Sequence, residues 1–194
     1  MKRSSLLSLL CGLTLGASVL VAGTAFAGPA TDTVKSKQSQ LFDKIRASDD
    51  AAVLALLDEM LDYDAIAKAS LGDQWGGLSS DQQTEFKGLL TKLVQQAYKK
   101  NLKKILDFDV EYVSEDASGD VTKVKTRAKS RSGNDDPVEI TFSLRSSGSS
   151  FKVVDIDTEG VSLVSSYRSQ FVKVIKKDGF GALIQKMKDK LAAG

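Results

Sequence analysis

Apolar residues recur at helical spacing in the first part of the chain after residue 33. The segment from Val34 to Ile45 shows this spacing within a sequence rich in Lys and Gln, which predicts a first helix lying across the surface of the fold. Asp49 and Asp50 offer an N-cap for a second helix, and a short third helix is expected over residues 63–70. The apolar face of the second helix consists of Val53, Leu54, Leu57, Met60 and Leu61.

The longest apolar stripe in the sequence follows Ser79. Ser79 and Gln82 have the spacing of a capping box, in which each residue's side chain accepts a hydrogen bond from the backbone N–H of the other. The stripe that follows extends for roughly 30 Å along one helix, at about 1.5 Å per residue. It consists of Phe86, Leu89, Leu90, Leu93, Val94, Ala97 and Tyr98, extended by Leu102 and Ile105.

At Asp107 the apolar period changes from about 3.6 residues to about 2, which indicates β-strands. Three successive segments alternate in this way, so each is predicted to be a strand with one buried face. Only short turn segments separate them, and these cannot hold crossover helices, so the strands form an antiparallel meander. The inward positions are Phe108, Val110 and Tyr112, then Val124, Thr126 and Ala128, then Val138, Ile140, Phe142 and Leu144.

A fourth strand over residues 151–158 carries apolar residues on both faces, with Val153 predicted on one face and Val154 and Ile156 on the other. Helical spacing returns after Gly160 in two segments that end near residues 175 and 191. The whole pattern predicts an α+β fold, a four-stranded antiparallel meander sheet with N-terminal and C-terminal helices packed on it. Periodicity does not show whether these apolar faces fill a solid core or surround an apolar pocket.

Residues 1–27 have the features of a secretory signal peptide. Lys2 and Arg3 precede an apolar run, and an A-x-A cleavage site ends at Ala27. One domain is expected over residues 28–194, and its 167 residues (194 − 27) contain no cysteine. An exported domain of this size without disulfides must be stabilised by its hydrophobic core. Because no later segment has about 18 consecutive apolar residues, we expect it to be soluble.

Charge and residue types exclude several classes of function. After residue 27, Lys and Arg number 25 (27 − 2) against 25 Asp and Glu, and this neutrality argues against a nucleic-acid partner. The sequence contains no histidine, which excludes Ser-His and Cys-His catalysis and His-ligated zinc. Carboxylates, Lys, Tyr and Ser remain as possible catalytic groups. We expect no metal, no cofactor and no catalytic residue.

Three local features each admit two interpretations. Trp75 lies between glycines and either plugs a loop or lines a ligand site. The carboxylates of Asp155, Asp157 and Glu159 suggest an acidic cluster, but they lack the spacing of a calcium loop and are interpreted as a polar strand end. The basic residues over 123–129 are interpreted as a solvated face paired across the sheet with Asp107, Asp109 and Glu111.

Several segments, in this order and spacing, resemble the MlaC family of periplasmic phospholipid-binding proteins. They are LGDQW at 71–75, DQQTEF at 81–86, FKVVDIDTEGVSLVSSYRSQF at 151–171 and GFGALIQKMKDKL at 179–191. The most specific part is EGVSLV-x-x-YRSQF. Two positions depart from the family pattern: Phe151 stands where many members have tryptophan, and two glycines follow Trp75 where a basic or polar residue is usual.

The resemblance implies a periplasmic phospholipid carrier and not an enzyme. Such a protein holds acyl chains between sheet and helices, and it shuttles lipid between an outer-membrane lipoprotein complex and an inner-membrane ABC transporter through transient contacts. Two other functions stay open from the residues alone. One is a periplasmic adaptor with a solid core that docks partners through lysine clusters over 99–104 and 173–177, and the other is a small isomerase or dehydratase that works without histidine.

Candidate pocket residues come from the inward strand positions and the helix stripes. Release of a lipid also requires the pocket to open, and we expect a helix to move away from the sheet, with Gly160 and Gly179 as hinges. The predicted lipid-binding residues are Trp75, Phe86, Leu90, Leu93, Val94, Tyr98, Val110, Tyr112, Val124, Ile140, Phe142, Leu144, Val153, Val161, Val164, Tyr167 and Phe171.

Overall fold

A computed structural model of the chain describes residues 28–133 and 136–193. The predicted signal peptide over residues 1–27 lies outside the described residues, so its cleavage stays a prediction. The side chains of residues 100–103 and 105 are also outside the description, and they include Leu102 and Ile105 of the predicted stripe and two lysines of the 99–104 cluster.

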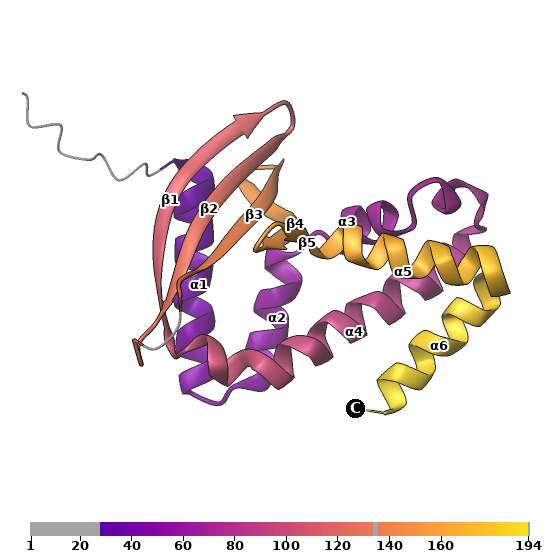
Figure 1. Ribbon diagram of the computed structural model, residues 1–194, viewed down its shortest axis with the longest axis horizontal. Coiled ribbons are helices and arrows are strands. Elements are labelled where there is room, and N and C mark those ends of the chain that lie inside the picture. Colours follow the sequence, from indigo (N-terminus) through magenta and orange to yellow (C-terminus); the bar gives the residue numbers. More distant parts are fainter. Residues whose placement is uncertain (1–27, 134–135, 194) are drawn as a thin grey trace, which may run out of the picture.

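The predicted α+β class is confirmed, with helices at both ends of the described chain and an antiparallel sheet between them (Figure 1). The first helices are α1 (Pro29–Arg46), α2 (Asp50–Met60), α3 (Tyr63–Leu71), the short 3₁₀ helix η1 (Gly72–Gly77) and the long α4 (Ser80–Ile105). The strands are β1 (Phe108–Ser118), β2 (Val121–Ser130), β3 (Val138–Ser147), β4 (Ser150–Thr158) and β5 (Val161–Ser162). The last helices are α5 (Leu163–Asp178) and α6 (Phe180–Ala192).

The sheet is an antiparallel meander in the order β1-β2-β3-β4-β5. It has a fifth strand beyond the four predicted, because Val161 and Ser162 pair with Thr158 and Asp157 before α5 begins. The turn before β5 is tight, and Gly160 adopts φ +79°, a conformation that side chains disfavour.

A β-bulge changes which residues of β4 share a face. Ser143 pairs with Asp155 while the next residue, Leu144, pairs with Val153, so Val154 is an extra residue in β4. Strict alternation placed Val153 and Ile156 on opposite faces, whereas both line the same cavity described below. That prediction is wrong because the bulge shifts the period-2 pattern by one residue.

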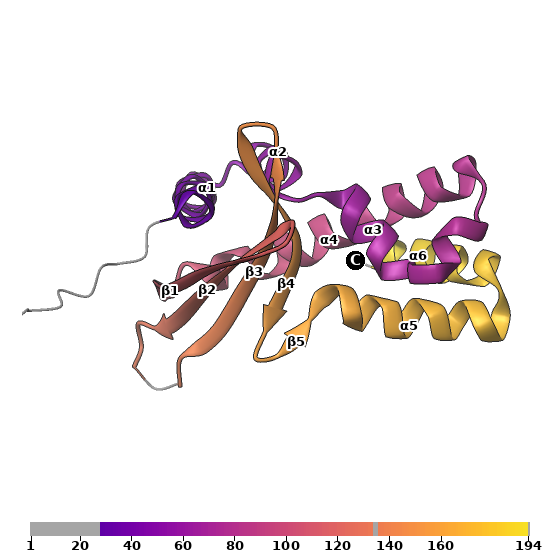
Figure 2. The same cartoon turned by 90° about the horizontal axis from the view of Figure 1, so that it is seen from above.

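The helices divide between two parts of the molecule. In the sheet half, α1 and α2 lie against one side of the sheet, as the view from above shows (Figure 2). In the helical half, α3, α5 and α6 pack around the N-terminal part of α4. Because α4 extends from one half to the other, its two ends have different neighbours.

Local sequence signals explain the helix starts. The capping box forms as predicted, since the backbone N–H of Ser79 donates to Gln82 Oε1 at 2.9 Å and that of Gln82 donates to Ser79 Oγ at 3.3 Å. Asp49 caps α2 by accepting from the backbone N–H of Ala52 at 3.0 Å. The N-terminus of α1 has a long-range partner instead, because the carboxylate of Glu115 on β1 accepts from the backbone N–H of Thr31 at 2.7 Å.

The three carboxylates at the end of β4 hold the β4–α5 connection together. Asp155 accepts from the Ser162 hydroxyl at 2.6 Å and from the backbone N–H of Val164 at 3.0 Å, so it fixes the first turn of α5. Asp157 accepts from the backbone N–H of Gly160 at 2.8 Å. Glu159 accepts from a backbone N–H of β3. The acidic residues therefore serve backbone hydrogen bonds at a strand end.

Candidate functional site

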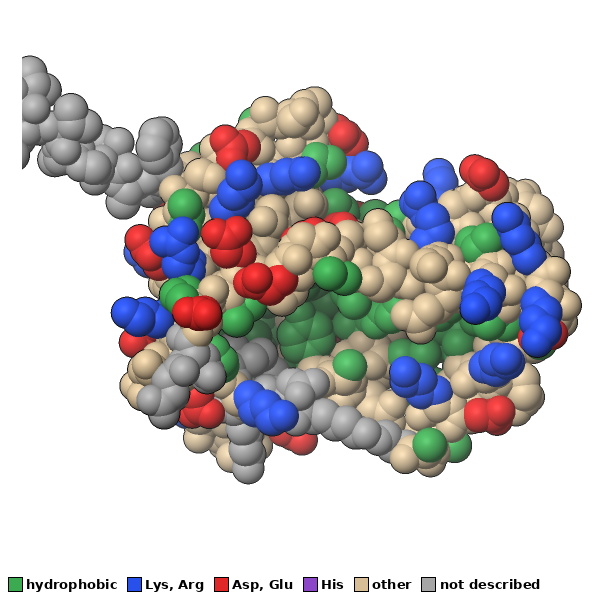
Figure 3. Space-filling view, viewed as in Figure 1, with side chains coloured by type: hydrophobic (Ala, Val, Ile, Leu, Met, Phe, Trp, Pro, Cys, Tyr) green, Lys and Arg blue, Asp and Glu red, His purple; other side chains and the backbone are tan. Residues whose placement is uncertain are grey.

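An apolar cavity of about 350 Å³ lies between the inner face of the sheet and helices α1, α2 and α4. In the space-filling view, hydrophobic side chains line a hollow near the centre of the molecule, beside the sheet (Figure 3). The helices, together with Leu61 directly after α2, contribute Val34, Gln38, Leu41, Phe42, Leu57, Met60, Tyr98 and Lys104. The strands contribute Phe108, Val110, Thr126, Ala128, Val138, Ile140, Phe142, Val153, Ile156 and Thr158.

Few polar groups face this cavity, and none of the described residues that line it is acidic. Thr126 is buried, but its hydroxyl donates to the carbonyl oxygen of Ile140 at 3.0 Å and is already satisfied. Among the described residues of the lining, Lys104 alone is charged, and its side chain is exposed to solvent. The cavity therefore combines apolar walls with a cation at the solvent boundary, which suits a ligand with an apolar body and an anionic end.

Tyrosines connect the cavity to its surroundings. The Tyr112 hydroxyl on β1 donates to Gln38 Oε1 on α1, which ties the edge of the sheet to the helix that covers it. Tyr98 lines the cavity from α4. Burial raises the pKa of Tyr112 to about 12, and burial together with the neighbouring Tyr167 raises the pKa of Tyr98 to about 12.

These tyrosines predict loss of stability at alkaline pH. The ordinary pKa of about 10 applies in the unfolded chain, so their contribution is fully present below pH 10 and is lost as the pH rises to about 12. Tyr98, the more deeply buried of the two, contributes up to about 2–3 kcal/mol, and Tyr112 contributes less because solvent screens its side chain. Denaturant unfolding at several pH values should show the free energy of unfolding falling over this range. The Tyr112→Phe variant should show a shallower fall, and a free energy that stays constant up to pH 12 would contradict the prediction.

The structure separates the predicted site residues into groups. Of the 17 residues, five line the cavity: Tyr98, Val110, Ile140, Phe142 and Val153. Seven others are fully or almost fully buried in the core, packed against other side chains: Phe86, Leu90, Val94, Val124, Leu144, Val164 and Phe171. Whether any of them contacts a lipid stays a prediction.

The remaining five predicted residues lie at separate places. Leu93 and Tyr167 line a hollow of about 610 Å³ between α4, α5 and α6, and Phe171 also borders it. Trp75 packs edge-on against Phe86, with ring centroids 6.5 Å apart. Tyr112 lies beside the cavity, and Val161 on β5 is 62% exposed.

The α1 wall of the cavity was not predicted from the sequence. The helix was predicted to lie on the surface because it is rich in Lys and Gln, but one of its faces covers the sheet. Val34, Gln38, Leu41 and Phe42 form this face at positions i, i+4, i+7 and i+8. That spacing was the available signal, and a polar residue within the stripe obscured it.

None of the described helices combines the length and the apolar character needed to cross a bilayer. Among the residues that the structure describes, no group of three or more carboxylate or thiol side chains is arranged to hold a metal ion.

Comparisons with known proteins agree with this architecture. The family model described as MlaC protein matches residues 27–189. A solved structure of the phospholipid-binding protein from Ralstonia solanacearum, in complex with a phospholipid, has the same fold with a TM-score of 0.74 and 23% sequence identity. The alignment covers 86% of this chain and 98% of that chain. No curated protein matches the sequence. Because the family match extends over most of the sequence, the chain belongs to the MlaC family.

Proposed function

We propose that this protein is a periplasmic phospholipid carrier that holds acyl chains in the cavity between the sheet and α1, α2 and α4. The proposal rests mainly on the apolar cavity, which has a lysine at its solvent boundary. Membership of the MlaC family and the phospholipid-bound neighbour of the same fold support this function. The proposed route leads between an outer-membrane lipoprotein complex and an inner-membrane ABC transporter.

Burial of the acyl chains supplies the binding free energy. Each CH₂ group removed from water contributes about 0.8 kcal/mol, so aliphatic and aromatic walls are sufficient to hold a lipid chain. Lys104 lies where a phosphate group would remain in solvent, and its charge would favour the anionic end of the lipid at that point. This division leaves the head group largely outside the protein.

A diacyl lipid requires the cavity to expand. Its volume of about 350 Å³ is at the lower end of the roughly 300–1,000 Å³ typical of ligand pockets. The helix α5 does not line the cavity, so its movement about Gly160 would not widen it directly. We infer instead that α1 and α2 move relative to the sheet, which would strain the contact between Tyr112 and Gln38.

Lipid extraction tests the proposal directly. Protein purified without added lipid should release phospholipid into organic solvent in near-stoichiometric amount, as measured by mass spectrometry. Delipidated protein should take up phospholipid again from vesicles, because the apolar cavity remains open to it. Protein that is empty after purification and also fails to take up lipid would overturn the proposal.

The two alternative functions fit the structure less well. A solid-core adaptor does not account for the cavity. A small isomerase or dehydratase would need an acid or base facing its substrate, and the lining contains no carboxylate among the residues that the structure describes. Lipid carriage accounts for both the apolar walls and the missing acid.

A further inference from the structure

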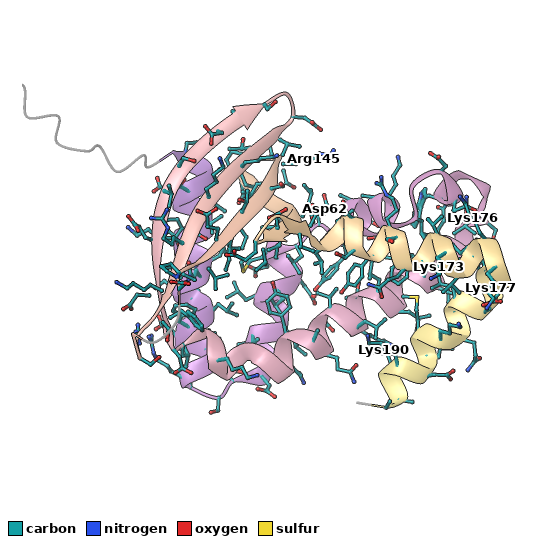
Figure 4. The ribbon with its side chains drawn as sticks, viewed as in Figure 1. Asp62, Arg145, Lys173, Lys176, Lys177 and Lys190 are labelled. Carbon is teal, nitrogen blue, oxygen red and sulfur yellow. The ribbon has the colours of Figure 1, made fainter. Side chains whose placement is uncertain are left out.

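A second hollow, of about 790 Å³, lies between α5 and the segment 71–74 at the start of η1. None of the residues that line it also lines the apolar cavity. We call it the basic groove and define it by Arg168, Lys173, Lys176 and Lys177 on α5. Figure 4 labels the three lysines along the part of α5 that is farthest from the sheet.

The charge of the basic groove is not balanced by its neighbours. Its four cations face a single carboxylate in the lining, that of Asp73, which leaves a net charge of +3 (4 − 1). Among the described residues, Lys173, Lys176 and Lys177 take part in no ion pair. The chain after residue 27 is formally neutral, so this is a local concentration of positive charge.

The basic residues of the sheet have a different environment. Arg127 lies between Glu111 and Glu139, at 3.7 Å from each carboxylate, and Arg131 is 2.8 Å from Asp109. Such cross-strand partners explain charge on the sheet without an external ligand. No equivalent partner explains the lysines of α5.

Arg168 is exposed in the basic groove and is anchored there by one hydrogen bond. Its Nε donates to the carbonyl oxygen of Ala69 near the end of α3 at 2.8 Å. Its side chain also lies against Gly72, where a Cβ atom would be 3.5 Å from Arg168 Nε and where φ is +54°. The terminal guanidinium nitrogens have no hydrogen-bond partner among the described residues, so a fixed cation is available to an anionic ligand.

The shape of the basic groove favours a peptide over a bilayer. Its α5 wall runs from Ser165 to Lys177, about 18 Å along the helix, which matches five or six residues of extended chain. Leu71 and Val172 add apolar contact between the charges. An extended segment can follow this row of exposed cations and place a side chain against Val172, which fits a peptide better than a planar membrane surface.

We propose that the basic groove binds an extended acidic peptide segment of a partner protein, with carboxylates on Arg168 and the α5 lysines and an apolar side chain against Val172. The partner would be a lipid donor or acceptor, and this part of the proposal rests on the proposed carrier function. Because the groove and the cavity share no residue, a docked partner leaves the cavity lining uncovered. Lipid could then enter or leave while the partner is bound.

The test compares two triple charge reversals with equal changes in net charge. One is Lys173→Glu/Lys176→Glu/Lys177→Glu in the basic groove, and the other is Lys123→Glu/Lys125→Glu/Lys129→Glu on the exposed face of β2. The probe is a fluorescent hexapeptide that repeats Glu-Glu-Leu, and its binding is followed by anisotropy at physiological salt. The groove variant should bind at least about tenfold more weakly, and the β2 variant should change affinity less than about twofold.

Equal weakening in both variants would overturn the proposal, because it would show general charge attraction. A second outcome would also overturn the proposal. The wild type would bind vesicles of anionic phosphatidylglycerol but not the peptide, and the groove variant would no longer bind the vesicles. The basic groove would then be a membrane-binding surface. Circular dichroism checks that both variants are folded. The lipid content of the groove variant should equal that of the wild type. If the wild type binds the peptide but holds no lipid, the docking site is supported and the proposed carrier function is wrong.

Discussion

Replacing Ala128 by tryptophan is expected to reduce the phospholipid carried by the protein at least about tenfold. Ala128 lies on β2, is 5% exposed and lines the apolar cavity. An indole ring at this position projects from the sheet into a space of about 350 Å³ and takes the place of acyl chain. The cavity can accept the ring, so the cost in stability should stay within about 1–3 kcal/mol for overpacking. Mass spectrometry of solvent extracts measures the lipid, and thermal unfolding measures stability.

A matched control separates blocking of the cavity from a general effect of tryptophan. Ala117 lies on β1 and is exposed, so Ala117→Trp introduces the same side chain outside the cavity. This control should carry as much lipid as the wild type. If Ala128→Trp folds and retains full lipid, the lipid does not occupy this cavity and the proposed binding site is wrong.

Replacing Phe86 by alanine is expected to lower the free energy of unfolding by about 3–5 kcal/mol. Phe86 is fully buried on α4, and its ring meets Phe171 edge-to-face with centroids 5.5 Å apart. It also contacts the rings of Trp75 and Phe180, with centroids 6.5 Å away in each case. Removing the ring leaves a void between helices that cannot close without moving α5 and α6. The unfolding midpoint should fall by roughly 6–20 °C.

The Phe108→Ala variant is the control for this prediction. Phe108 on β1 is half-buried and lines the cavity, so truncation only enlarges a space that already exists. Its cost should be about 1 kcal/mol, measured by the same denaturant titration. Equal losses in the two variants would contradict the division between the core around Phe86 and the walls of the cavity.

The strand pattern predicted much of the cavity wall. Phe108, Val110, Ile140 and Phe142 lie on the inward face that simple alternation assigned to them, and all four line the cavity. Alternation failed at β4, where the extra residue Val154 changes the phase. The bulge depends on pairing with β3, and nothing within the β4 sequence alone indicates it.

The apolar stripes of the helices were predicted at the correct residues. The elements against which each stripe packs were not predicted. The stripe on α4 is continuous in sequence, yet Phe86 and Leu90 pack in the helical half while Tyr98 reaches the cavity. Conversely, α1 has a largely polar sequence and still supplies a wall. The neighbours of a helix are set by interactions between residues far apart in the chain, such as the hydrogen bond from the N-terminus of α1 to Glu115.

Apart from β5 and the bulge in β4, the sequence by itself determined the strands and helices, the caps at Asp49 and Ser79, the α+β class and, through its motifs, the family. These properties follow from short-range hydrogen bonding and from the period of apolar residues, which are local in the chain. Only the tertiary structure decided which apolar residues fill the core and which surround the cavity, because both kinds obey the same period. It also brought η1 against α5, which turned a row of lysines into the wall of a groove.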